Sequence, residues 1–273
     1  MSAVPPSAKN LIARPIRDNP FSNISLDVII PFKDNHAQLY NLIDEIYAIR
    51  NVRLNLILVD DNSRSGKFVE QFSKTSWIKT HRFTENKGFG FCVNHGVKMS
   101  ESNFCFVIHS DVYNLPKNIF KDMVLGLDAG KNDRLALISA VLDKPVPKTC
   151  TYMCKNSTMD PEAYYSVLEE TQFVPLICVA FSKQAFSKVG GLPTYPLCFF
   201  EDKLLAEKFN LFNYKFGLCN RVFVRHKGSE TINNILKENP SYKSVLEENK
   251  KRFVDDIKVI KTATSQKKDL TKK

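Results

Sequence analysis

The sequence predicts an α/β protein with a doubly wound, mostly parallel sheet and a C-terminal helical extension. Short apolar runs alternate along the chain with segments whose apolar residues recur at helical spacing. This alternation is typical of parallel strands connected by helices that cover both faces of the sheet. A length of 273 residues and a hydrophobic content of 43% also allow a substantial core.

Four strand–helix repeats are expected in the first half of the chain. The expected strands are Leu26–Pro31, Leu54–Val59, Ile78–Phe83 and Phe104–Ile108. The first helix follows a polar turn that offers an N-cap, the second runs through about Ser73, the third carries Val93, and the fourth runs from about Pro116 to Leu127. Because ligands bind at the carboxyl ends of strands in open α/β sheets, the turns after these strands are the first place to look for a site.

The second half has a less regular pattern. Further strands are expected at Leu135–Ala140, Val174–Phe181 and Arg221–Arg225. Residues 141–171 form a long excursion with one short helix from about Pro161, and such excursions are often binding elements or lids. Ser182 is expected to cap a short helix, and another helix begins near Glu201.

The two ends of the chain differ from the part between them. Residues 1–25 carry four prolines and are expected to form an arm, whereas residues 236–273 form a basic helical tail. The segment from Lys237 onward has eleven Lys or Arg against six Asp or Glu, which is half of the net charge of +10. The tail is either a solvated helix or a peripheral contact to an anionic membrane or polymer. The domain between them, 26–235, is divided into two halves, 26–115 and 116–235.

The seven cysteines lack a paired-ligand pattern for zinc, with Cys150 and Cys154 as the only close pair. Several of the others lie among apolar residues, as free thiols in a reducing compartment do. The sequence shows neither an apolar run of ~20 residues nor a signal-peptide core. A cytoplasmic protein is therefore expected, possibly peripheral to a membrane.

An abrupt change from apolar to polar residues at His109, Ser110 and Asp111 marks a candidate metal site. The triplet follows the apolar run Phe104–Ile108, which has the pattern of a strand buried on both faces. Asp111 either holds a divalent cation or begins a turn. His226 follows the last expected strand and can complete the coordination of Mn²⁺ or Mg²⁺, with imidazole favouring Mn²⁺.

Two acidic pairs are further candidates. Asp60 and Asp61 follow a buried strand, where carboxylates either bind a nucleobase or ribose, or cap the next helix. Glu201 and Asp202 fall in a first helical turn, where acids are favoured for structural reasons. The two phenylalanines before them can also keep an acid partly dry, which suits it to proton abstraction.

The order of these motifs resembles the family 2 glycosyltransferases with a GT-A (Rossmann-like) fold, in particular their rhamnosyltransferase-like members. The likeness spans residues 26–229. It rests on DVIIPFKDN (27–35), LILVDDNS (56–63), ENKGFGFCVNHGV (85–97), VIHSDV (107–112), GGLPTYPLCFFED (190–202) and VRHKGS (224–229). Each motif alone is weak, and six of them in order make a specific pattern.

The resemblance implies an inverting, metal-dependent transferase that moves a sugar from a nucleotide-sugar donor, such as a UDP-sugar, to a hydroxyl of a glycan or glycoconjugate acceptor. Asp202 is implied as the general base, with Glu201 supporting it, and Gly190 and Gly191 would let the acceptor approach the backbone. The implied nucleotide-sugar contacts are Pro31, Phe32, Lys33, Asp61, Asn86, Lys87, Gly88 and Ser110. The implied metal ligands for Mn²⁺ or Mg²⁺ are Asp111, His226 and His109.

Two residues depart from the family pattern. His109 stands at the usual first acid of the DxD metal motif, and Lys33 replaces a frequently aromatic or polar residue. The alternative function is therefore a catalytically silent nucleotide-sugar or glycan-binding protein on the same fold. A sugar-nucleotide pyrophosphorylase is disfavoured, because no glycine-rich, Arg-containing loop follows the first strand. No nucleic-acid partner is expected.

Overall fold

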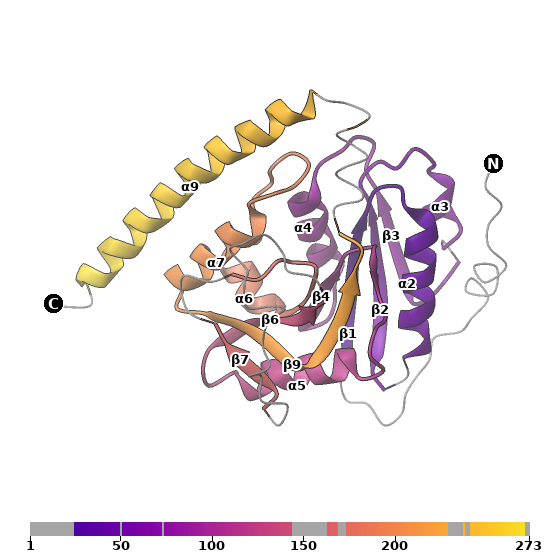
Figure 1. Cartoon of the computed structure of the whole chain (residues 1–273), viewed down its shortest axis with the longest axis horizontal. Helices are drawn as coiled ribbons and strands as arrows, with labels where there is room; N and C mark the ends of the chain where they lie inside the picture. Colours follow the sequence, from indigo (N-terminus) through magenta and orange to yellow (C-terminus); the bar gives the residue numbers. More distant parts are fainter. Residues whose placement is uncertain are drawn as a thin grey trace.

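The computed structural model describes residues 25–49, 51–72, 74–143, 163–168, 173–228, 237 and 241–270, with side chains described as far as residue 263. These residues contain one nine-stranded sheet with the order β3-β2-β1-β4-β8-β6-β9-β5, and β7 pairs with β9 (Figure 1). The strand order reverses after β3, because the chain returns from that edge to place β4 beside β1. The predicted α/β class with a doubly wound, mostly parallel sheet is confirmed.

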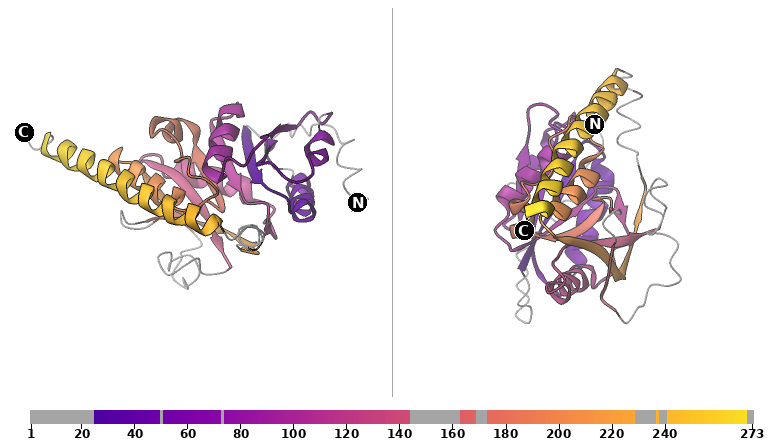
Figure 2. Two further views of the ribbon diagram at one scale, coloured as in Figure 1. Left: turned by 90° about the horizontal axis from the view of Figure 1, so that it is seen from above. Right: turned by 90° about the vertical axis from the view of Figure 1, so that its left-hand side faces the viewer.

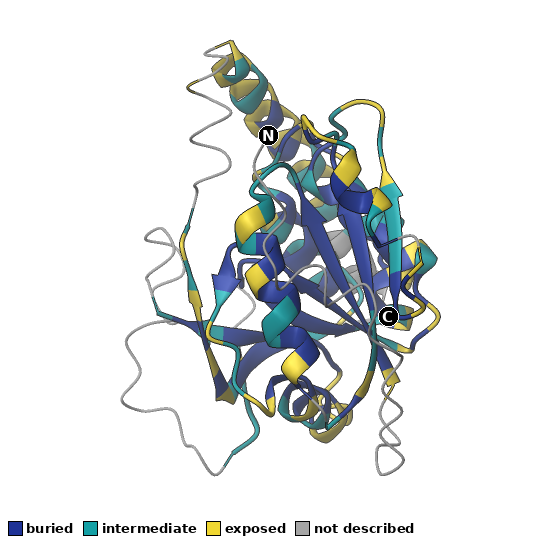
Figure 3. Cartoon of the chain, turned by 90° about the vertical axis from the view of Figure 1, so that its right-hand side faces the viewer, coloured by how far each residue is buried: buried dark blue, intermediate teal, exposed yellow. Residues whose placement is uncertain are grey.

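The first four strands are parallel to one another, as the sequence predicts. They are β1 (Ser25–Phe32), β2 (Arg53–Asp60), β3 (Ile78–Arg82) and β4 (Phe104–Ile108). The middle strands are buried almost throughout, which explains their continuous apolar runs (Figure 3). Their shared direction brings the turns after β1, β2 and β4 to one edge of the sheet, called here the carboxyl edge.

Helices cover both faces of this parallel part. Helices α2 (His36–Ala48) and α3 (Lys67–Glu70) lie on one side of the strands, and α4 (Phe89–Met99) lies on the other (Figure 1). The expected side-chain cap of α2 is absent, because its N-cap Asn35 adopts a left-handed φ of 51° and makes no cap hydrogen bond through its side chain. The α3 helix is also shorter than the prediction through about Ser73.

The second half adds strands of both directions. Strand β8 (Cys178–Ser182) is antiparallel to both neighbours, β4 and β6 (Leu135–Leu142). The connecting helices are α5 (Ile119–Ala129), α6 (Lys183–Lys188) and α7 (Glu201–Leu211). The predicted cap of α6 is confirmed, since the Ser182 hydroxyl accepts a hydrogen bond from the Ala185 N–H at 3.3 Å.

The long strand β9 (Lys215–His226) is where the sequence prediction was least accurate. It is more than twice the predicted length, and its ends pair with the short strands β7 (Tyr165–Val167) and β5 (Val112–Tyr113). The helix predicted from about Pro161 is wrong for residues 165–167, because their β-prone side chains pair with β9 instead. The arm before residue 25, the pair Cys150 and Cys154, and most of the long excursion lie outside the described residues.

The C-terminal segment is helical as predicted and forms α9 (Tyr242–Leu270). Part of α9 packs against α7, and its far end extends beyond the body of the protein (Figure 2). Buried Phe253 contributes to a small apolar cluster between the two helices. Within the described part of the chain, no helix is both long enough and apolar enough to cross a membrane.

Candidate active site

Three side chains with metal-ligand chemistry meet at the carboxyl edge. His109, Asp111 and His226, called here the metal-ligand cluster, each offer one ligand atom, and these atoms all lie within 4.8 Å of one another. His226 Nε2 is 3.0 Å from Asp111 Oδ1, and the His109 and His226 rings meet edge to face at 5.5 Å. The structure thus brings together all three residues that the sequence named as metal ligands.

Backbone pairing explains how residues more than 100 positions apart come together. In the β5–β9 pair, Val112 lies opposite His226, and the Lys227 N–H donates to the Asp111 carbonyl at 3.2 Å. The His109 carbonyl accepts from the Val112 N–H at 3.1 Å, which closes a tight turn around Asp111. Asp111 therefore takes part in a turn and faces His226 at the same time, so the two sequence interpretations are compatible.

The chemistry of the cluster fits a divalent cation. His226 Nε2 is buried and has no hydrogen-bond partner within the described residues, although Asp111 Oδ1 is close to it. Burial lowers the pKa of His109 to about 4, so its imidazole is neutral and keeps a lone pair available at neutral pH. Burial acts to raise the pKa of Asp111, but the adjacent His226 and His109 bring it below its ordinary value. A ligand set of two imidazoles and one carboxylate suits Mn²⁺ better than Mg²⁺.

Asp61 joins the turn after β2 to the segment that precedes α4. Its carboxylate accepts hydrogen bonds from the backbone N–H groups of Lys87 (2.6 Å) and Gly88 (3.0 Å). Burial nevertheless raises the pKa of Asp61 above its ordinary value. The structure therefore places Asp61, Lys87 and Gly88 in one unit, and adjacent Asn86 is partly exposed beside it.

The neighbouring acid, Asp60, is buried within the same turn and has a different environment. Its Oδ1 accepts from the Ser63 N–H at 2.7 Å, and its Oδ2 lies 3.2 Å from Arg82 Nε. Asp60 is 0% exposed, so it stabilises the turn and does not face a ligand. The expected capping of the next helix is wrong for Asp60, because α3 begins at Lys67 with Gly66 as its N-cap and without a side-chain cap hydrogen bond. The acid available for a ligand contact is Asp61.

Two basic side chains, Lys33 and Arg82, fix the shape of the same turn. Lys33 Nζ donates to the Asn62 carbonyl at 2.7 Å, which links the turn after β1 to the turn after β2. Arg82 Nη2 donates to the Ser63 carbonyl at 2.7 Å. Sequence reasoning missed Arg82, because a basic residue at the end of a strand carries no signal until its buried partner Asp60 is known.

The remaining predicted nucleotide contacts also border this edge. Pro31 and Phe32 are the last residues of β1, and the buried Phe32 ring packs against Phe68 at 5.4 Å. Ser110 is 7% exposed within the turn that carries the metal-ligand cluster.

Two glycines let the segment before α4 approach the loop that leads to Glu201. A Cβ on Gly88, which has a φ of 89°, would lie 2.5 Å from the Tyr195 carbonyl oxygen, and one on Gly90 would lie 2.1 Å from that of Pro193. Between them, the Phe89 N–H donates to the Leu197 carbonyl at 2.7 Å. The segment held by Asp61 is therefore in direct contact with residues 192–200, called here the pre-α7 loop.

Glu201 and Asp202 begin α7 in surroundings that disfavour their charged forms. Glu201 is 1% exposed, and burial together with Asp202 raises its pKa to about 8. Asp202 is partly buried, and burial raises its pKa to about 6, although the N–H groups of Asp202 itself and Leu176 hydrogen bond to it. Both carboxyls therefore hold a proton more readily than ordinary acids do, and Glu201 does so more than Asp202.

Gly190 and Gly191 lie on the same face as α4, at the end of α6. Both have left-handed φ values, 78° and 66°, and their N–H groups close the last turn of the helix. A Cβ on Gly191 would lie 2.6 Å from Asn94 Oδ1, while nothing lies within 4 Å of one on Gly190. Asn94 also binds both backbone groups of Leu192, so Gly191 has a clear packing role, and Gly190 has open space for a ligand.

Comparison with known proteins places this arrangement in a family. The model of the family described as glycosyl transferase family 2 matches residues 27–190, which is more than half of the chain. The chain therefore belongs to glycosyl transferase family 2. It is also 26% identical over 106 residues to a dolichyl-phosphate beta-glucosyltransferase of Dictyostelium discoideum, a match that covers 34% of this chain and only about a third (32%) of the relative.

Solved structures show the fold. The mannosyltransferase PcManGT from Pyrobaculum calidifontis, in complex with GDP-Man and Mn²⁺, matches with a TM-score of 0.56 and 14% identity, covering 95% of this chain and 81% of that one. A crystal structure of S. aureus TarS matches with a TM-score of 0.55 and 14% identity, covering 78% of this chain and 63% of that one. At such identities the likeness concerns the fold alone, which is GT-A.

Proposed function

We propose that this protein is an inverting glycosyltransferase that uses a nucleoside-diphosphate sugar and a divalent cation to glycosylate an acceptor hydroxyl. One observation carries the proposal. A metal-ligand cluster and an acid pair with raised pKa values both adjoin the segment anchored by Asp61, because the Phe89 ring meets His109 at 5.1 Å and the Phe89 N–H donates to the loop that leads to Glu201. The PcManGT complex, which contains GDP-Man and Mn²⁺, supports this assignment by analogy of fold.

The donor would bind across the turns after β1, β2 and β4, in the nucleotide-binding half proposed at residues 26–115. Asp61 would accept a hydrogen bond from the base, and Lys33 together with Lys87 and Gly88 would shape the base pocket. Because Asp61 and Lys33 already hold backbone groups of these turns, the turns would need little rearrangement to bind the donor. Ser110 would lie near the ribose.

The diphosphate would lie at the metal-ligand cluster. A cation held by Asp111, His109 and His226 would offset the negative charge that develops on the leaving nucleoside diphosphate. The chain's own contribution is to hold two of these ligands in the turn between β4 and β5 and the third at the end of β9, which pairs with β5. The likeness to rhamnosyltransferase-like members further suggests a hexosyl or deoxyhexosyl donor.

Asp202 would remove the proton from the acceptor hydroxyl. A carboxyl with a pKa of about 6 is ionised at neutral pH and is a stronger base than an ordinary aspartate. The acceptor oxygen would attack the anomeric carbon from the face opposite the diphosphate, so the configuration would be inverted. Glu201, whose pKa burial raises to about 8, would be protonated and would support Asp202 without competing for the proton. The acceptor would bind within residues 116–235, near the open side of Gly190.

A thermal-shift screen followed by a transfer assay tests the proposal. A nucleoside diphosphate at one hundred times its Kd, with Mn²⁺ present, is expected to raise the Tm by about 5–10 °C, and chelation should abolish the rise. The matching nucleotide sugar should then be consumed when an acceptor sugar is supplied. If no nucleotide raises the Tm, the proposed donor site is wrong. If nucleotides bind but no donor is turned over, the silent binding protein is the correct alternative.

A further inference from the structure

Helix α9 carries a buried asparagine that binds the backbone of the pre-α7 loop. Asn249 is 1% exposed, although the residues on either side of it, Glu248 and Lys250, are exposed. Its Nδ2 donates to the Pro196 carbonyl at 2.7 Å and to the Cys198 carbonyl at 3.2 Å. One amide thus binds the carbonyl groups of the two residues on either side of Leu197. This contact is unexpected for a basic tail, because a polar side chain of the tail is buried and hydrogen bonds to backbone groups of a loop distant in sequence.

The loop that Asn249 binds has an unfavourable backbone conformation. Leu197, Phe199 and Phe200 have φ values of 64°, 85° and 75°, in the left-handed region that bulky residues avoid. Phe200 is the N-cap of α7, so the residues immediately after this stretch are Glu201 and Asp202. A strained segment persists only when its surroundings determine it fully, and here it directly precedes the proposed catalytic acids.

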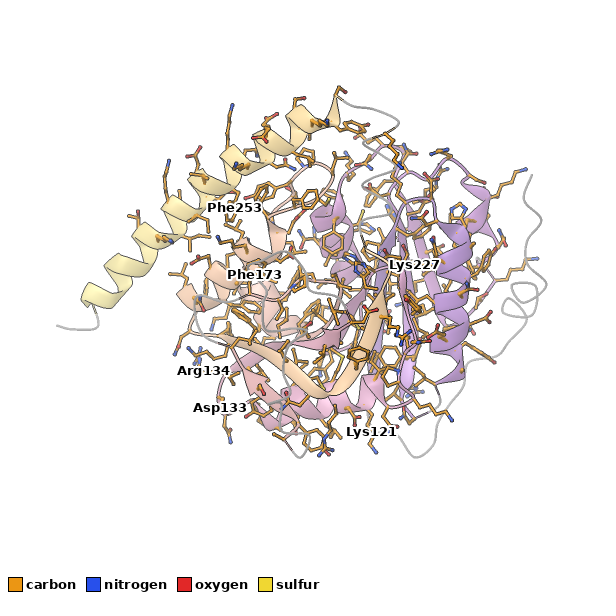
Figure 4. The ribbon with its side chains drawn as sticks, viewed as in Figure 1. Lys121, Asp133, Arg134, Phe173, Lys227 and Phe253 are labelled. Carbon is orange, nitrogen blue, oxygen red and sulfur yellow. The ribbon has the colours of Figure 1, made fainter. Side chains whose placement is uncertain are left out.

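Further contacts hold the loop from the side of α9. The Tyr195 hydroxyl donates to Asp256 Oδ2 at 2.6 Å, and the Phe200 and Phe253 rings stack with centroids 5.0 Å apart. Figure 4 shows Phe253 on the side of α9 that faces the body of the protein. On the opposite side of the loop, the Phe89 N–H donates to the Leu197 carbonyl. The loop is therefore held between the segment anchored by Asp61 and one face of α9.

We infer that α9 positions the catalytic acids, and that Asn249 is the positioning residue through which it acts. The inference rests on the proposed function for the roles of Glu201 and Asp202. Without the two carbonyl contacts, the loop would relax toward ordinary φ values, and the first turn of α7 would shift relative to the donor. The turns after β1 and β2, where the donor would bind, would not shift, because hydrogen bonds of Asp61, Asp60 and Lys33 hold them without a contact to α9.

The test compares Asn249→Ala with Lys250→Ala, an exposed neighbour on the same helix, in the full-length protein. For Asn249→Ala, kcat should fall at least about 10-fold, since small displacements of catalytic groups reduce rates strongly, while the donor KM stays within about twofold. The pH at which kcat is half-maximal should also move toward that of an ordinary aspartate. Lys250→Ala should match the wild type in all three. Unchanged kcat in Asn249→Ala, or an equal loss of donor affinity, would overturn the positioning role.

Hydrogen exchange supplies a readout that does not depend on the proposed activity. Peptides covering the pre-α7 loop and the first turn of α7 should exchange at least about 10-fold faster in Asn249→Ala, because exchange reports local opening. Peptides from the turns after β1 and β2 should be unchanged. If loop exchange does not change, α9 does not hold the loop, whatever the reaction is. If exchange rises in a protein that transfers no sugar, the proposed function fails and the structural contact stands.

Discussion

Two buried acids at opposite edges of the sheet have opposite electrostatic behaviour. Asp27, near the amino ends of β1 and β4, and Glu201, at the carboxyl edge, are both 1% exposed. Burial acts to raise the pKa of each, yet the pKa of Asp27 lies below its ordinary value and that of Glu201 rises to about 8. Burial therefore does not decide the protonation state by itself.

Hydrogen bonds account for the difference. Asp27 accepts from Asn55 Nδ2 at 3.0 Å, from the Glu101 N–H at 2.8 Å and from the Ser102 N–H at 3.2 Å. Glu201 instead has Asp202 beside it, and its Oε1 has no hydrogen-bond partner within the described residues. The structural acid Asp27 thus has hydrogen-bond donors at its carboxylate, whereas Glu201 of the acid pair has one carboxyl oxygen without a donor among the described residues. Substitutions of the acids at each edge test whether Asp27 serves stability and the acid pair serves catalysis.

Asp202→Asn is expected to have the largest effect, and on catalysis alone. Loss of the general base should lower kcat about 10³-fold, with the Tm and the affinity for nucleoside diphosphate nearly unchanged. In the wild type, kcat should rise as the pH passes about 6 and then level, because the carboxyl must lose its proton to act. Steady-state rates measured from pH 5 to 8 check both points. Glu207→Gln on the same helix is the control, and a fully active Asp202→Asn enzyme would show that the base is elsewhere.

Asp27→Ala should have the opposite profile. Removing the carboxylate leaves two backbone N–H groups and the Asn55 amide without their acceptor, so the free energy of unfolding should fall by about 2–4 kcal/mol. The folded-state pKa is below the unfolded value, so the wild-type contribution is complete at neutral pH and is lost as the pH falls through the folded-state pKa. Urea unfolding at pH 7 measures the difference. Reduced kcat per folded molecule would mean that the amino edge takes part in function.

Asp111→Asn should act on the cation and the donor together. The substitution keeps the size of the side chain but removes the only carboxylate of the metal-ligand cluster, so transfer should fall about 100-fold. The rise in Tm with nucleotide and Mn²⁺ should disappear, while the stability without ligand should not fall. Asp128→Asn, at an exposed position on α5, is the control. Retained Mn²⁺ dependence would instead assign the cation to other residues.

The features that the sequence predicted well depend on local pattern. The apolar runs of β1, β2 and β4 mark buried strands, and the polar residues directly after them mark the carboxyl edge. Asp61, Asp111 and His226 could be named because each follows such a strand or its turn. The start of α7 was also predicted from local pattern, because Glu201 and Asp202 stand at a helix start after a loop that contains two prolines.

The features that the sequence did not predict depend on pairing between distant residues. Strand β5 has only two residues, too few for a pattern, and it exists because the last two residues of β9, Arg225 and His226, pair with it. The partnership of Arg82 with Asp60 joins two turns and has no local signature. Asn249 is one polar residue within a charged helix, and its importance appears only when the pre-α7 loop lies against it. Long-range contacts of this kind become visible only in the folded chain.

The last prediction concerns the effect of Glu201, the acid with the raised pKa, on the pH dependence of stability. Because the folded state binds its proton more tightly than the unfolded state does, the contribution of Glu201 to the free energy of unfolding should decrease as the pH rises from about 4.5 to about 8. Glu201→Gln mimics the protonated form and should remove this contribution, so its free energy of unfolding should exceed that of the wild type by a few kcal/mol at pH 8 and not at pH 4.5. Thermal or urea unfolding of both proteins across this range tests the sign. If the stability of Glu201→Gln relative to the wild type did not increase over the same range, Glu201 would be ionised when folded, and the contrast with Asp27 would no longer hold.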